Sequence, residues 1–163
     1  MLRIKKSILI NSSKENVWNI ISNISNKKLW SLNIIDSNLL SESLDIGTEI
    51  EHNTIFKYKF KDKILLKLEG NKIIMESFNP ILRLKTINSW SVISSQEKCL
   101  VVYVSTVIGK FNFLKSRKLK KKLDATSNNK LAQLKYFIEN NKKCSNKSLL
   151  EFKGIHKIKN RID

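Results

Sequence analysis

The sequence predicts an α+β domain in which a curved antiparallel sheet of about six or seven strands grips one long C-terminal helix. Three observations support this prediction. A short helix-forming stretch follows one alternating segment at the start of the chain. Apolar residues then recur at every second position from about 33 to 109, and 114–141 has helical spacing without Gly or Pro. The 163 residues suit one domain, which we place at 1–141. We expect 142–163 to be a basic tail that is weakly ordered or docked.

The first elements are a strand and two short helices. Apolar and polar residues alternate over 2–11, which predicts a half-buried strand. Its apolar stretch, Ile8–Ile10, is too short for the core of a signal peptide, so we expect a cytoplasmic protein. Ser12 and Glu15 fit a capping box at a helix start. A second short helix should end near Trp30, and the two helices should close one end of the core.

The middle of the chain is predicted to form antiparallel strands. The clearest one, in GTEIEHNTIFKYKFK, ends near Lys61, and the last one, CLVVYVSTVIG, is apolar on both sides, so we expect both of its faces to be buried. The lone proline, Pro80, cannot join a central ladder. The predicted strands are 33–41, 49–61, 63–69, 72–78, 82–93 and 99–109.

The last helical segment is the only element long enough to cover the apolar face of such a sheet. Its apolar residues can share one face, which should pack into the concave side of the sheet. These residues are Leu123, Leu131, Leu134, Phe137 and Ile138. In this arrangement we expect Trp18 and Trp30 to serve mainly in packing the core.

The chain holds five short motifs in the order SSKENVWNII, Trp30, Gly47, ESFNPILRLK and NKLAQLKYFIEN. Together they resemble the START-like superfamily of helix-grip proteins, also called SRPBCC, which includes polyketide cyclases and lipid-transfer domains. SSKENVWNII is similar to the first helix of the family, Trp30 to the tryptophan that often opens the second strand, and NKLAQLKYFIEN to the final helix. The resemblance covers about 1–141. It implies a deep apolar cavity between sheet and helix that serves the binding, or the binding and transport, of a hydrophobic small molecule or lipid.

If the predicted strand 49–61 turns one face inward, that face supplies polar groups to this cavity. His52 is the only plausible general acid or base there. The alternative to a binding protein is therefore a cyclase or dehydratase type of enzyme that uses His52, and whether the chain is an enzyme stays open. The predicted cavity residues are Ile50, His52, Thr54, Phe56, Tyr58, Met75 and Trp90.

Positive charge is concentrated in the last third of the chain and gives a second alternative. The net charge is +17, and residues 110–163 hold 16 basic and 4 acidic groups. Codon bias toward lysine explains a high total but not this concentration. A basic surface could bind anionic membrane, RNA or an acidic protein. The candidate residues are Lys115, Arg117, Lys118, Lys120, Lys121 and Lys122.

Several other functional classes lack support in the sequence. Two histidines and two cysteines, without a CxxC pair, make a metal site improbable, and we expect no cofactor. The glycine-rich and HExxH motifs are absent. No aromatic pattern of an RNA-recognition motif is present, so nucleic acid is not the favoured partner.

Overall fold

The computed structural model describes residues 1–79, 84–109 and 113–142. Its elements are the strands β1 (Leu2–Ile10), β2 (Ile34–Leu39), β3 (Glu49–Thr54), β4 (Lys59–Leu68), β5 (Lys72–Asn79), β6 (Leu84–Ser95) and β7 (Lys98–Ile108), the helices α1 (Lys14–Ser22), α2 (Lys27–Trp30) and α3 (Phe113–Asn140), and the 3-10 turn η1 (Ile24–Asn26). The predicted tail, apart from Lys142, and Pro80 lie outside the described residues.

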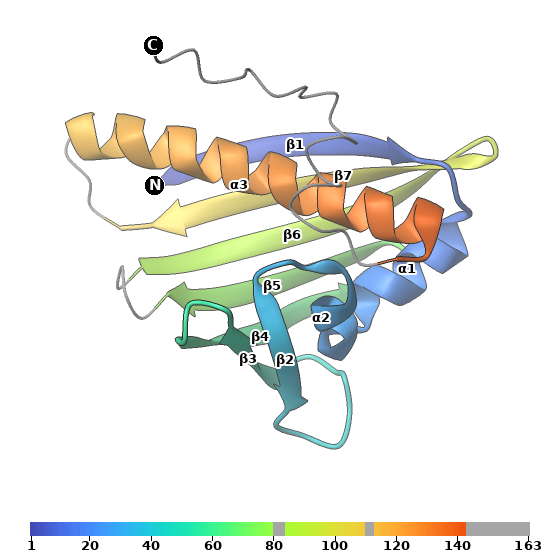
Figure 1. The fold of residues 1–163 in the computed structure, drawn as a ribbon, viewed down its shortest axis with the longest axis horizontal. Coiled ribbons are helices and arrows are strands. Elements are labelled where there is room, and N and C mark those ends of the chain that lie inside the picture. The colour runs from blue at the N-terminus through green and yellow to red at the C-terminus, as the bar shows by residue number, and fades with distance from the viewer. Residues whose placement is uncertain (80–83, 110–112, 143–163) are drawn as a thin grey trace, which may run out of the picture.

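The seven strands form one antiparallel sheet in the order β1-β7-β6-β5-β4-β3-β2. Helix α3 lies along β1 and β7, and α1 and α2 close one end of the sheet (Figure 1). This arrangement confirms the predicted helix-grip architecture. None of the described helices is long and apolar enough to cross a membrane.

The cap of α1 is shifted by one residue from its predicted position. Ser13, rather than Ser12, has extended backbone and accepts a hydrogen bond from the Asn16 N–H at 3.2 Å. Ser12 instead accepts from the side-chain amide of Asn16 at 2.8 Å. The predicted start of the helix is correct, but Ser13 takes the N-cap position that was expected for its neighbour Ser12.

The predicted single strand 49–61 is wrong, because the chain turns between β3 and β4 at residues 55–58. Lys57 has a left-handed backbone with φ of 60°, and its N–H donates to the Thr54 carbonyl at 3.0 Å. The Thr54 N–H in turn donates to the Tyr58 carbonyl at 3.1 Å. The register pairs even-numbered residues of β3 with even-numbered residues of β4, as in His52 with Phe60, so the sequence alternation runs through the turn without a break. Phe60 and Asp62 then continue the inward face on β4.

Strand β7 is buried on one face, whereas the sequence predicted burial of both faces. Val101, Tyr103 and Val107 face the core and are at most 2% exposed. The alternate residues Val102 and Val104 are only partly buried, because the described helices pack on the opposite side of the sheet. The apolar outer face is a real departure from the usual one-sided pattern.

The core joins both short helices to α3 and the sheet. Trp18 and Trp30 are 3% and 4% exposed, as expected for packing residues. The Trp30 ring meets Trp90 edge to face, with centroids 5.9 Å apart, and Trp90 contacts Tyr103 at 4.3 Å. Leu134 on α3 packs into this cluster. The core therefore depends on aromatic contacts at the end of the sheet that the short helices close.

Candidate functional site

A hydrogen-bonded series of polar side chains crosses the concave face of the sheet, and we call it the polar chain. It takes side chains from each strand between β2 and β7 and ends on α3. Most of its members are buried. Its members are Ser37, His52, Asp62, Ser77, Asn88, Tyr103, Ser105 and Lys130, with Lys27 joining from α2.

Asp62 is the centre of the polar chain. Its carboxylate is 0% exposed and accepts from Lys27 Nζ at 2.6 Å, from His52 Nε2 at 3.1 Å and from the Ser77 hydroxyl. Burial raises the pKa of Asp62, but the Lys27 charge and the His52 hydrogen bond outweigh it and hold the pKa well below its usual range. Asp62 is therefore ionised, and its negative charge compensates the positive charge of Lys27, which α2 places against the sheet.

His52 lies between a hydroxyl and this carboxylate. Because a carboxylate only accepts, Nε2 carries the proton and donates to Asp62, and Nδ1 accepts from the Ser37 hydroxyl at 2.8 Å. Burial lowers the pKa of His52, although the bond to Asp62 opposes this effect. The ring is thus neutral at pH 7. It is 0% exposed and both nitrogens are occupied, so this closed form presents no ring nitrogen to a substrate.

The other half of the polar chain is organised by the Asn88 side chain. Its amide N–H donates to the Ser77 hydroxyl at 3.0 Å, and its oxygen accepts from Tyr103 at 2.7 Å and Ser105 at 2.9 Å. Lys130 of α3 donates to the Tyr103 hydroxyl oxygen at 3.1 Å. Burial lowers the pKa of Lys130, but Tyr103 outweighs it and the net direction is upward. The polar chain thereby ties α3 to the sheet.

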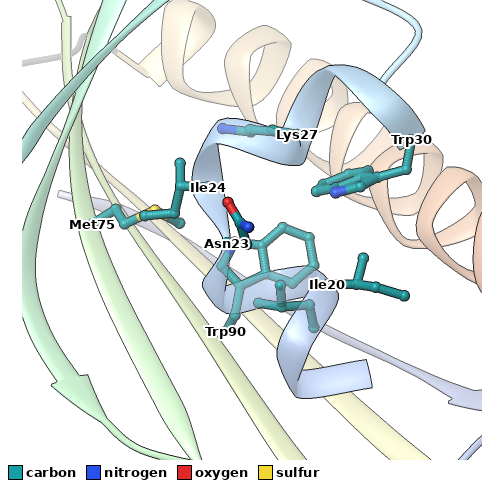
Figure 2. Close-up of a pocket in the computed structure, with 8 residues that line it drawn as sticks. Ile20, Asn23, Ile24, Lys27, Trp30, Met75 and Trp90 are labelled. Carbon is teal, nitrogen blue, oxygen red and sulfur yellow. The ribbon is translucent and has the colours of Figure 1, made fainter. Parts of the chain in front are cut away.

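A small apolar pocket lies beside the polar chain, between α1, α2 and the sheet (Figure 2). It encloses about 10 Å³, which is room for about one water molecule. Figure 2 shows the rings of Trp30 and Trp90 close to each other in its wall. The lining residues are Ile20, Ile21, Asn23, Ile24, Lys27, Trp30, Met75 and Trp90.

The indole N–H of Trp30 has no hydrogen-bond partner among the described residues. It is fully buried in the wall of this pocket, where a lost hydrogen bond is costly. The indole N–H of Trp18, in contrast, donates to Glu69 at 2.6 Å. The pocket thus combines an apolar lining with one unsatisfied donor.

This difference predicts unequal effects of the same substitution at two buried tryptophans. Trp30→Phe should lower the free energy of unfolding by about 1–2 kcal/mol less than Trp18→Phe, because only Trp18 loses a hydrogen bond. Both changes remove a similar apolar volume, so each serves as the control for the other. Urea unfolding monitored by circular dichroism measures the difference. An equal or larger loss for Trp30→Phe would show that its N–H is satisfied.

The predicted cavity residues are only partly brought together. Met75 and Trp90 line the pocket. Ile50, His52 and Thr54 are buried on β3, where they share the inward face. Phe56 is 63% exposed. Phe56 and Tyr58 lie in the β3–β4 turn rather than on an inward strand face. Their predicted place in the cavity wall followed from the missed turn.

Sequence reasoning missed several members of the polar chain. Asp62 was overlooked because the predicted strand ended before it, although its even number places it on the same inward face as His52. Lys27 and Lys130 looked like two more of many surface lysines. Only their contacts with Asp62 and Tyr103 distinguish them. The only sequence feature that pointed to Asp62 was its even number, which continues the series of inward-facing residues Ile50, His52 and Thr54.

The predicted basic cluster lies on the first half of α3. The side chain of Lys115 lies outside the described set. The other five, Arg117, Lys118, Lys120, Lys121 and Lys122, are exposed. Three of them, with Asp124, line a shallow depression of about 300 Å³. Asp124 itself pairs with Lys6 of β1 at 2.6 Å. The depression is therefore lined by basic groups, and the one acid in its lining already forms an ion pair with Lys6.

Across the described ranges, no three His, Cys, Asp or Glu side chains are placed to hold a metal ion.

Comparisons with known proteins identify the fold. No family model matches the sequence, and no curated protein matches it. Among solved structures, the di-domain ARO/CYC protein BexL from the BE-7585A biosynthetic pathway matches with TM-score 0.73 and 14% identity over 85% of this chain. The Aha1 dimer from Colwellia psychrerythraea matches with TM-score 0.64 and 14% identity, over 85% of this chain and 97% of that one.

A protein from Thermobifida fusca also matches, with TM-score 0.71 and 13% identity over 89% of this chain and 98% of that one. The chain spans about half of the di-domain proteins, 47% of BexL and 51% of StfQ from the steffimycin pathway. At these identities the likeness shows the fold alone. The chain has the START-like helix-grip fold that its motifs predicted.

Proposed function

We propose that this START-like helix-grip domain binds a small, mainly apolar molecule with a hydrogen-bond acceptor, in the pocket between α1, α2 and the sheet. The observation that carries the proposal is the buried Trp30 N–H, which has no partner among the described residues. An acceptor in the pocket would satisfy this donor. Ile24, Met75 and Trp90 would supply the apolar contacts that are usual in ligand sites.

The pocket must widen to admit such a molecule. Its volume of about 10 Å³ is far below the roughly 300–1,000 Å³ of ligand pockets. Part of its wall is formed by η1 and α2, which have three and four residues. The ion pair between Lys27 and Asp62 at 2.6 Å ties this wall to the sheet. Binding therefore proceeds with an outward movement of η1 and α2 that strains or breaks this ion pair.

Nuclear magnetic resonance of the indole N–H groups tests the proposal. Trp30→Phe and Trp18→Phe assign two of the three indole signals. Cyclohexanone supplies an apolar ring with an acceptor, and methylcyclohexane is the matched probe without one. We expect cyclohexanone to move the Trp30 signal more than methylcyclohexane does and to leave Trp18 in place. A Trp30 signal that stays unmoved at saturating cyclohexanone would contradict the proposal.

A second candidate is dehydratase or cyclase chemistry with His52 as the base. The observation that favours it is the Ser37–His52–Asp62 relay, with contacts of 2.8 and 3.1 Å, next to the pocket residue Lys27. Such chemistry requires the same opening, because the imidazole is sealed in the closed form. Any compound released from the purified protein is the substrate to test. Full turnover by a His52→Ala protein would rule out this role.

A further inference from the structure

The antiparallel topology brings six chain segments together at one end of the sheet, where five strands and α3 begin or end. The start of β1 pairs with the end of β7, and the start of β6 pairs with the same end of β7. The end of β5 lies beside the start of β4, which continues from the turn 55–58. Helix α3 begins after β7 at this edge, and Figure 1 shows its first turn beyond the strand ends there. We call this end of the sheet, where these strand ends and the start of α3 lie, the basic edge.

Large apolar side chains at the basic edge are exposed to solvent. Each belongs to a strand end, the β3–β4 turn or the first turn of α3, and none is covered by another described element. Exposed apolar residues also lie at the opposite edge, among them Leu40, Ile46 and Leu68, so the charge around these side chains is what distinguishes the two edges. The residues and their exposures are Ile55 49%, Phe56 63%, Phe78 51%, Ile108 41% and Leu114 77%.

Basic residues accompany these apolar side chains and outnumber the acids near them. The sequence has no acid between Glu97 and Asp124. Among the described residues, Arg117 and Lys118 form no ion pair within 4 Å. Other cations at this edge are Arg3 and Lys57, together with Lys59, Lys61 and Lys85, which pair with Glu51, Glu49 and Glu76. The opposite edge holds exposed acids in its loops and in α1, namely Glu15, Glu42, Asp45, Glu69 and Glu97.

We propose that the basic edge docks on an anionic lipid bilayer. Apolar tips that enter the interface while neighbouring lysines and arginines contact lipid headgroups are the combination that holds a protein on such a surface. A single-stranded nucleic acid would be bound through cations and stacked aromatic rings. Ile55, Ile108 and Leu114 are aliphatic and cannot stack on bases, so the bilayer is the better match. The acidic opposite edge would orient the molecule with α1 away from the membrane.

Vesicle sedimentation with the full chain tests this docking mode. The vesicles contain phosphatidylcholine with or without phosphatidylserine. We expect binding only with phosphatidylserine. Phe56→Ser with Leu114→Ser should weaken it roughly tenfold or more, and so should Arg117→Gln with Lys118→Gln. All four side chains are exposed, so the variants should fold, which circular dichroism verifies.

Matched controls change the same chemistry away from the basic edge. Ile46→Ser with Leu40→Ser removes two apolar side chains that are 62% and 52% exposed in the β2–β3 loop. Lys5→Gln with Lys98→Gln removes two exposed charges. Both controls should bind like the parent protein. Equal losses for controls and edge variants would overturn the proposal. So would an undiminished affinity of the Phe56/Leu114 variant, or binding to poly(U) with no binding to phosphatidylserine vesicles.

Discussion

Replacing Asp62 with alanine is expected to lower the free energy of unfolding by about 3–5 kcal/mol. The substitution removes the acceptor of three donors, Lys27, His52 and Ser77, at a site that is 0% exposed. The Lys27 ammonium, whose side chain is 12% exposed, then keeps most of its burial without a counter-ion. Removing one member of a buried ion pair is costly because the remaining charge has no compensation.

Urea unfolding at neutral pH measures this effect, and an exposed ion pair provides the control. Lys28 and Asp36 lie 2.7 Å apart, with side chains 41% and 40% exposed. Asp36→Ala should cost less than about 1 kcal/mol, since surface pairs contribute little. A comparably small loss for Asp62→Ala would show that water reaches the polar chain and that the site is open in solution.

Acid is expected to destabilise the protein in two steps, beginning below about pH 6.5. Burial lowers the pKa of His52 in the folded state, so between the folded and unfolded pKa values the unfolded chain binds more protons. Stability therefore falls as the pH drops through this window, by up to about 1.4 kcal/mol per pH unit for one group. The pKa of Asp62 is held low by Lys27 and His52 against burial, so a second loss follows below about pH 4.

His52→Gln separates the first step from the rest of the acid response. A glutamine can place its amide N–H near the position of Nε2 and keep a donor for Asp62, but it does not titrate near neutrality. Its free energy of unfolding should therefore change less between pH 7 and 5 than that of the parent protein. Urea unfolding across this range makes the comparison. An identical slope in both proteins would show that His52 titrates normally in the folded state.

The sequence was enough to predict the fold because its strongest patterns are local. The alternating strands, the helix start near Ser13 and the long helix α3 each depend on neighbours in the chain, and all are present. The turn at 55–58 was missed because β3 and β4 pair even-numbered residues with even-numbered residues, so the alternation in the sequence is the same on both sides of the turn. Its one irregular feature, the left-handed Lys57, is not a residue that marks such a turn.

The candidate site was harder to predict because its meaning depends on contacts across the sheet. Trp30 was correctly expected to pack, but only the structure shows that its N–H lacks a partner among the described residues. Lys27 becomes distinctive only through Asp62, which lies 35 positions away. His52 was expected to face a cavity, and it faces inward to hydrogen bonds instead. Pairing partners of this kind leave no periodic signal in one sequence.

Native mass spectrometry of the freshly purified protein, followed by solvent extraction, tests whether the pocket binds a ligand. We expect a stoichiometric mass increment from a small, mainly apolar molecule with a hydrogen-bond acceptor. Trp30→Phe should reduce the bound fraction, and Trp18→Phe, which leaves the pocket wall intact, should not. The contradictory result is an increment that is equally abundant in both variants, or an apo mass that persists when cyclohexanone is added in excess.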